Sequence, residues 1–298
     1  MSIRVNPDIL PDLVASIEQS QQNAQTATQE LATGRSVNNL SDNPAAAAAL
    51  VNNDALTSEN DQYLTNLTDL QGKLQAGSSA LNSAVQLMTT AISLGTEGAT
   101  GTLSSADRQV IAQQVQGIQQ QMLALANTSY EGTYIFSGTN VTTQPFAQNA
   151  GSPSGVQYNG NGDVTTIQIG EGNSMQTNVA GDQIFSNANG NVFQALNDLV
   201  NSLNSGNGID TANTEVQQAF SRLTTQQVFY GNALSQVQNS QNYLNQEQVD
   251  LSALQNQLVG ANMTQVATDE SQSVTAEEAA LSATAQILSL PTILKYIS

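Results

Sequence analysis

The residues with the most chemical potential lie in a glycine-rich stretch in the middle of the chain. Asn159-Gly-Asn-Gly-Asp163 offers amide and carboxylate oxygens, which are ligands that calcium accepts. The stretch lacks the later Glu of an EF-hand loop, and a hairpin turn explains the same residues, so both interpretations stay open. Asp163 and Glu171 are the only acids between Glu131 and Asp182, and flexible glycine-rich surroundings position neither of them for paired-carboxylate catalysis.

The composition excludes several classes of function. The 298 residues include no Cys and no His, which removes thiolate catalysis, the commonest general base and the commonest metal ligands. We therefore expect no enzyme, no cofactor and no metal centre. The net charge is −18 and the six bases are scattered, which argues against binding nucleic acid or an anionic membrane. No apolar run approaches the length of a membrane span, and no cleavable signal peptide is recognised at the start.

Both ends of the chain carry a seam of small and apolar residues. These seams repeat every seven residues or in alternating steps of four and three, at Leu10, Ile17, Ala24, Leu31, Ala276, Ala280, Ala283, Ile287, Leu290, Leu294 and Ile297. Pro291 should kink or end the second helix. Such seams bury little area against the entropy of ordering the backbone, so we expect disordered ends in the monomer that fold when many copies bundle.

Two longer seams lie inside the terminal ones. Leu56 begins a row of residues spaced by seven that extends to Ala91, and Val216 begins another that extends to Leu258. Strict seven-residue spacing predicts supercoiled helices that pack against each other. We expect the glycines from Gly95 to Gly101 to end the first helix, and Ser104 with Asp107 to begin the next one as a capping box.

The segment between the two inner seams has a different pattern. Short β-branched and aromatic runs alternate with Gly and Asn clusters over 137–190, which predicts a small hairpin-rich insertion. The fold class expected is mainly α: a long coiled-coil or helical-bundle rod with paired terminal helices and a small central β-rich insertion. The expected domains are 1–42 with 262–298, 43–136 with 191–261, and 137–190.

A turn segment separates the N-terminal seam from the first long helix. Gly34 suits the position after a helix, and Asn43 before Pro44 is typical of an N-cap followed by a first helical proline. The polar residues Arg35, Asn38 and Asp42 fit an exposed turn. They fit equally well a joint at which subunits contact one another.

Four parts of the sequence together resemble the flagellin-like family. Residues 31–44 (LATGRSVNNLSDNP) are similar to its N-terminal motif, which includes Gly34, Arg35, Asn38, Asp42 and Pro44. Residues 130–139 (YEGTYIFSGT), together with Pro44, resemble the hook-associated protein 3 branch. The segments 179–185 and 192–199 are similar to that branch's return into helix, and 285–297 resembles the family's closing helix.

The resemblance implies a structural role in the bacterial flagellum. It implies a junction subunit between hook and filament that forms a ring through its terminal helices and contacts flagellin and the other junction protein. It further implies export without a cleaved signal, assisted by a cytosolic chaperone, and an extracellular location. The closing segment, with Pro291 and the Gln286–Leu290 run, also leans towards flagellin, so a filament subunit is the alternative.

Overall fold

The computed structural model describes residues 9–39, 41–187 and 190–289, with the side chains of 9–10 and 287–289 left aside. Leu290, Leu294, Ile297 and Pro291 of the predicted C-terminal seam therefore lie outside the described residues. The described chain divides into two compact units, one formed by 1–58 with 248–298 and the other by 59–247. Each unit is considered by itself below. This division follows contacts, and the three-domain division expected from the sequence stays a prediction.

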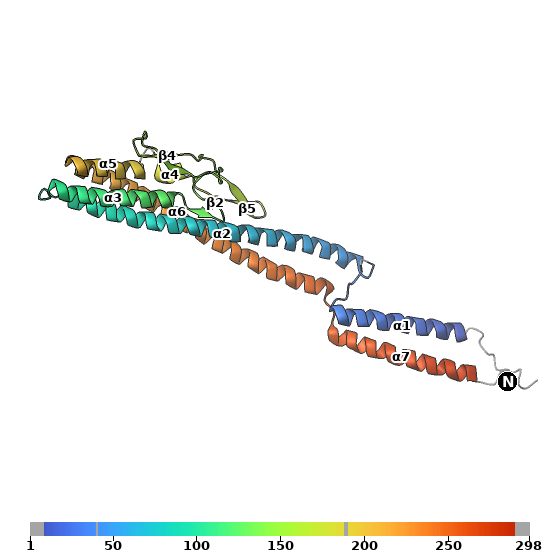
Figure 1. Ribbon diagram of the computed structural model, residues 1–298. Coiled ribbons are helices and arrows are strands. Elements are labelled where there is room, and N and C mark those ends of the chain that lie inside the picture. The colour runs from blue at the N-terminus through green and yellow to red at the C-terminus, as the bar shows by residue number, and fades with distance from the viewer. Residues whose placement is uncertain (1–8, 40, 188–189, 290–298) are drawn as a thin grey trace, which may run out of the picture. The chain divides into compact units, whose positions relative to one another are not determined.

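The described part of the chain is mainly helical with a small β-rich insertion, as the sequence predicts (Figure 1). The helices are α1 (Ile9–Thr33), α2 (Pro44–Gly98), α3 (Ser105–Ala126), α4 (Gly181–Phe185), α5 (Val192–Ser205), α6 (Ile209–Val259) and α7 (Met263–Ser289). The strands are β1 (Ser129–Tyr130), β2 (Thr133–Tyr134), β3 (Phe146–Gln148), β4 (Val156–Tyr158), β5 (Thr166–Gly170) and β6 (Asn173–Gln176). The strands form three separate antiparallel two-stranded ladders, which pair β1 with β2, β3 with β4 and β5 with β6.

The helices begin where local chemistry satisfies their first amides. Asn43 Oδ1 accepts a hydrogen bond from the Ala46 amide at 3.1 Å, which caps α2 immediately before its first-turn proline. Ser104 and Asp107 form the predicted capping box at the start of α3. Helix α2 ends at Gly98, within the run of glycines from Gly95 to Gly101 that the sequence predicts to end it. Gly95 is an interior position at which the missing Cβ gives room to Asn213.

The core of the second unit lies between α2, α3, α5 and α6. The rows predicted from seven-residue spacing are buried there, including Leu70, Ala84 and Leu223. A second row of α2, offset by four residues, is also buried and includes Leu67, Leu81 and Met88. Leu56 is the exception in the α2 row, with 42% of its surface exposed. The helix turns Asn53 and Asn60 inwards instead, in the row that continues through Leu67.

Glycines in α2 allow aromatic side chains to approach its backbone closely. A Cβ at Gly77 would lie 2.5 Å from Cε1 of Tyr230, and one at Gly72 would overlap the Tyr130 ring. Tyr130 reaches α2 from a two-residue hairpin whose turn residues, Glu131 and Gly132, both have positive φ. Gly77, a seam position in the heptad pattern, therefore leaves space on α2 for the Tyr230 ring.

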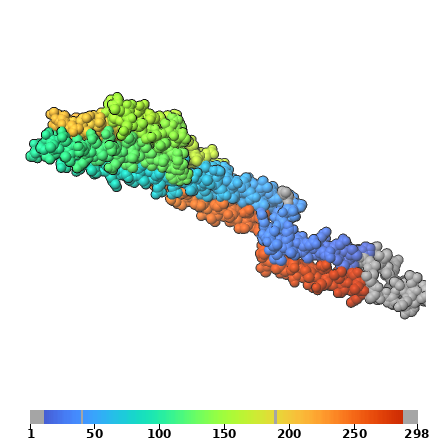
Figure 2. All heavy atoms as spheres, in the orientation of Figure 1, coloured from blue at the N-terminus to red at the C-terminus, as the bar shows by residue number. Residues whose placement is uncertain are grey.

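An aromatic cluster joins the insertion to the helices of the second unit. Phe136 meets Phe185 edge-on at 5.3 Å between ring centroids, and Tyr230 at 6.5 Å. Phe146 and Phe193 extend the cluster towards α5. The Tyr158 hydroxyl lies 3.0 Å from the Phe136 carbonyl oxygen, and burial together with Asp182 raises the pKa of Tyr158 to about 12. The insertion thus packs firmly on one side of the bundle (Figure 2).

Candidate assembly surface

The turn after α1 is tied to the segment that precedes α7. The Ser36 amide donates to the Val259 carbonyl at 2.7 Å, and the Ala261 amide donates to the Gly34 carbonyl at 3.0 Å. Arg35 and Gly260 form an antiparallel bridge between these two bonds. Gly34 has a φ of +69°, the left-handed conformation that ends a helix at little cost for glycine. The two connections therefore form one joint, fixed by main-chain hydrogen bonds.

Asp42 closes this turn from the other side. Its Oδ2 accepts hydrogen bonds from the Asn39 amide at 2.7 Å and the Asn38 amide at 3.0 Å. The bond from the Asn39 amide, helped by that from Asn38, lowers the pKa of Asp42 below its ordinary value of 3.8. Asn38 Nδ2 donates to the Arg35 carbonyl at 2.9 Å. A carboxylate at position 42 thus organises the backbone of the turn.

A small apolar cluster lies beneath the joint. Val37, Ala46 and Val259 are buried together, with Leu50 and Leu258 packed against them. Pro44 begins α2 and so fixes the direction in which that helix leaves the turn. The family-motif residues therefore have local structural roles: helix end, turn closure and helix start. Whether the same turn also contacts another subunit stays a prediction.

The terminal helices α1 and α7 pair along their length, as the sequence predicts. The pair buries little: on the described faces only Ala27 of α1 and Val266 of α7 are more than nine-tenths covered. Gln21 Nε2 donates to Glu277 Oε1 at 2.8 Å across the pair. Half-buried positions follow the steps of a heptad on each helix, at Leu13, Ile17, Ser20, Ala24, Leu31, Glu270, Ser273, Glu277 and Ala280.

The structure places the predicted seam residues unequally. Ile17, Ala24 and Leu31 on α1 face the pair, as do Ala280 and Ala283 on α7. Leu10 and Ile287 lie in the helices, but their side chains are outside the described residues. Ala276 is exposed beside a groove. The role of this whole set in contacts between subunits stays a prediction.

The first half of the α7 row that faces α1 lies outside the seam predicted from the sequence. Its members are spaced by alternating steps of four and three, and they are Val266, Glu270, Ser273 and Glu277, which lead to Ala280. The spacing alone could have identified this row. A pattern defined by apolar residues does not include this row, because three of its members are Glu or Ser.

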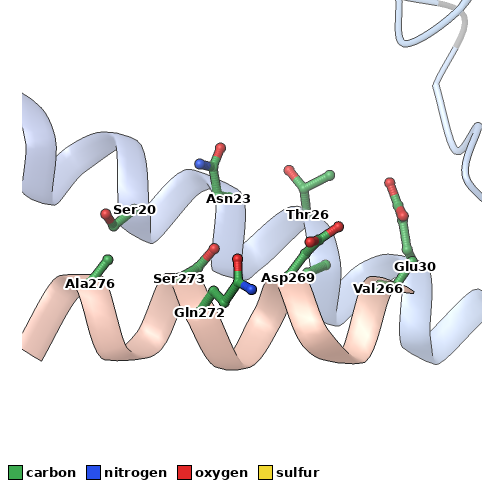
Figure 3. A pocket seen from close by; sticks show the side chains of 10 residues that line it. Ser20, Asn23, Thr26, Glu30, Val266, Asp269, Gln272, Ser273 and Ala276 are labelled. Atoms are coloured by element: carbon green, nitrogen blue, oxygen red, sulfur yellow. The ribbon is translucent and has the colours of Figure 1, made fainter. Parts of the chain in front are cut away.

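Two grooves flank the helix pair. Figure 3 shows one of them, a polar groove that Ser20, Asn23 and Thr26 line from α1 and Asp269, Gln272 and Ser273 line from α7. The other runs along the opposite side, past Gln25 and Val274. Exposed apolar side chains remain around the pair: Val14 is 48% exposed, Val274 38% and Leu281 50%. The pair therefore presents surfaces on which further helices can pack.

The described residues contain no clustered metal ligands. Within 9–39, 41–187 and 190–289 no cluster of three or more His, Cys, Asp or Glu residues could hold a metal ion. In the Asn159–Asp163 loop, Asp163 Oδ2 accepts from Asn161 Nδ2 at 2.9 Å, and Asn161 Oδ1 accepts from the Thr139 amide at 2.8 Å. These oxygens thus hold the loop together. No helix of the described chain is both long and apolar enough to cross a membrane.

Comparison with known proteins confirms the resemblance inferred from the sequence. Residues 12–141 match the family model of the bacterial flagellin N-terminal helical region. Over 168 residues, 55% of this chain, the sequence is 33% identical to flagellar hook-associated protein 3 of Escherichia coli. Over 179 residues, 60% of this chain, it is 31% identical to the Salmonella typhimurium protein of the same name. The chain spans about half the length of these relatives, 50% and 55% respectively.

Solved structures show the same fold. The flagellar junction protein FlgL from Legionella pneumophila superposes with a TM-score of 0.61 at 14% sequence identity. The match covers 71% of this chain and all of the Legionella chain.

Proposed function

We propose that this chain is a structural junction subunit of the bacterial flagellum, connecting hook to filament. The observation that carries the proposal is the identity of 33% with the hook-associated protein 3 of E. coli. The fold shared with a flagellar junction protein supports it. The family-motif turn, with Asp42 closing it and Pro44 starting the next helix, is a second support from the chain's own residues.

Assembly in this proposal runs through α1 and α7 and forms a ring. The pair leaves Val14, Val274 and Leu281 exposed and buries few side chains of its own. Packing copies against both grooves covers those residues and adds the apolar burial that one pair lacks. The terminal unit thus gains most of its stability on assembly, as segments that fold on binding do.

The partners that follow are other flagellar proteins. The subunit contacts flagellin on one side of the ring and the other hook–filament junction protein on the other side. The subunit is an extracellular component of the flagellum. No catalytic step and no cofactor belongs to this role.

A deletion strain tests the function directly. Loss of the gene should leave hooks assembled and should abolish filament attachment, with filament protein released into the medium. Electron microscopy of the cells distinguishes bare hooks from missing ones. A strain without hooks, or one with attached filaments, contradicts the proposal.

The alternative is a flagellin that builds the filament itself. A filament subunit must stack on its own kind without limit, whereas a junction ring fits different proteins above and below it. We expect no long filaments from the purified protein at high concentration or after salt seeding. Filament growth from this protein alone identifies it as flagellin.

The C-terminal helix is the proposed binding site of a cytosolic export chaperone. An exposed amphipathic helix fits a helix-in-groove partner. Removing residues 276–298 should abolish co-purification of the chaperone and leave the urea unfolding of the second unit unchanged. Unchanged co-purification of the chaperone places its site elsewhere.

A further inference from the structure

Three helical stretches of the second unit carry no charged side chain. They are residues 74–96 of α2, 109–126 of α3 and 223–246 of α6, in a chain whose net charge is −18. Their exposed positions are filled mainly by Gln, Asn, Ser and Thr. The charged residues of these helices therefore lie outside the three stretches, which give the bundle an uncharged part of its surface.

A groove opens on this uncharged surface between α2 and α3. Its lining combines small, polar and apolar side chains: Ser83, Leu87, Thr90, Gln121, Ala124 and Leu125. Leu87 and Leu125 are half-buried, so part of their apolar surface faces the groove. Gly117, one α3 turn from Gln121, has no atom within 4 Å of the place where a Cβ would stand. The groove is apolar at its floor and lined with amides at its rim.

On the uncharged stretch of α6, apolar side chains project from the surface instead of lining a groove. Val228 is 58% exposed and Phe229 is 41% exposed, next to the buried Tyr230. No residue of α6 lines the groove between α2 and α3. Each chain therefore has an uncharged groove on one pair of helices and a projecting apolar side chain on another helix.

Electrostatics selects the partner for this surface. Two copies with a net charge of −18 repel each other, and like charges brought face to face at a contact cost several kcal/mol. The three uncharged stretches are where copies can approach without placing carboxylates opposite one another. Amide and hydroxyl side chains at the rim can hydrogen-bond to their counterparts on another copy. Charged surfaces of either sign gain little here, whereas the uncharged face of α6 on a second copy matches this surface in both polarity and charge.

We propose that the groove between α2 and α3 receives the uncharged face of α6 from a second copy, with Val228 seated over Leu87 and Leu125. The contact is heterologous, since groove and projecting residue are different surfaces, so every copy can use both. A heterologous contact closes into a ring when its rotation closes. In this respect the inference rests on the proposed junction function and adds the lateral contact to it.

Disulfide trapping in the full-length protein tests the contact, because the chain has no cysteine of its own. Thr90→Cys on the groove and Val228→Cys on α6 are made in separate chains, mixed at the highest soluble concentration and oxidised. The expected product is a mixed dimer that neither variant forms alone. Homodimers of the Thr90→Cys chain indicate an isologous contact and overturn the proposal. A mixed yield no higher than that from Asn207→Cys with Val228→Cys, where position 207 lies in an exposed loop, also overturns it.

A charge placed in the groove provides the second test. Gln121→Glu in the Thr90→Cys chain should lower the yield of mixed dimer about tenfold, because a carboxylate then faces an apolar side chain in a desolvated contact. Thr102→Glu adds the same charge in an exposed turn outside the uncharged stretches and should leave the yield unchanged. Equal yields from both variants overturn the proposal.

The two proposals fail in different ways. If the deletion strain loses its filaments but no mixed dimer forms, the lateral contact is wrong and the junction function stands. If the mixed dimer forms and the deletion strain keeps its filaments, the junction function is wrong and the contact stands.

Discussion

The terminal helix pair and the bundle of the second unit use the same heptad spacing with different residues. Along α2 and α6 the spacing carries Leu, Met and Tyr, and side chains such as Leu81 and Met88 are completely buried. Along α1 and α7 it carries Ala, Ser and Glu, and Ala27 is among the few covered side chains. Spacing sets which residues face each other, whereas side-chain volume sets how much free energy that contact contributes. The bundle of the second unit can therefore be stable by itself, whereas the terminal pair needs neighbouring copies.

The largest effect should come from the aromatic cluster. Phe136→Ala removes a fully buried ring that contacts Phe185 and Tyr230, and should lower the free energy of unfolding by about 3–5 kcal/mol. Urea unfolding followed by circular dichroism measures the loss. Phe229→Ala is the matched control, because its ring is partly exposed and its removal should cost far less. Equal losses from the two variants contradict the assignment of Phe136 to the core.

The next effect concerns the seat of Tyr230 on α2. Gly77→Ala places a Cβ 2.5 Å from a ring that cannot move aside because it is buried, and should destabilise the second unit by about 1–3 kcal/mol. Gly231→Ala is the control, since that helical glycine has open space around it. It should stabilise the protein by up to about 1 kcal/mol. Thermal unfolding of both variants should therefore shift in opposite directions.

The terminal pair should respond weakly to mutation in the monomer. Ile17→Ala should change the urea unfolding of the second unit by less than about 0.5 kcal/mol, because that side chain is only half-buried in a marginal pair.

Limited proteolysis of the unmutated monomer should trim both ends to a core near 45–262, because weakly held segments open often and expose their backbone to protease. Protease-resistant ends in dilute solution contradict a terminal pair that depends on assembly.

The smallest effect should be a local one at the joint. The pKa of Asp42 is lowered in the folded turn, so its contribution is present above its ordinary value of 3.8 and is lost as the pH falls through the folded value. NMR signals of the Asn38 and Asn39 amides should shift in that acid range while those of the bundle stay constant. In Asp42→Ala the Asn38 and Asn39 amide signals should no longer change with pH, because the titrating carboxylate is absent. A shift that persists in Asp42→Ala assigns it to another group.

Much of the architecture could be predicted from spacing alone. The buried rows of α2 and α6 and the pairing of the ends follow from apolar and small residues at fixed intervals. The β-rich insertion follows from short β-branched and aromatic runs between Gly and Asn clusters. The caps at Asn43 and Ser104 could be predicted because a helix start depends on residues three positions apart. Local rules thus succeeded where the interacting groups are neighbours in sequence.

Features that depend on distant residues could not be predicted. Asn53 and Asn60 occupy the buried row because their Nδ2 atoms donate to the carbonyls of Leu251 and Leu244, at 3.2 and 3.0 Å. The apolar pattern predicts Leu56 in the buried row, but its side chain is partly exposed. The close approach of Asn213 to Gly95 of α2 likewise depends on a residue more than 100 positions away. The polar half of the α7 row is a different case, because its regular spacing is present in the sequence and only the polar character of its Glu and Ser residues conceals it.

The bond between Gln21 and Glu277 spans 256 positions of the chain, and this separation has a consequence for the order of folding. Closing so long a loop before any other contact exists carries a large entropic cost for a contact that contributes little. Pairing of α2 with α6 removes most of that cost, because the ends then lie only a short joint away from each other. We therefore expect α2 and α6 to pair first and the terminal helices α1 and α7 to pair afterwards. The helices α1 and α7 then pair last during folding and separate first during unfolding. They are therefore the helices that can most easily exchange partners between molecules.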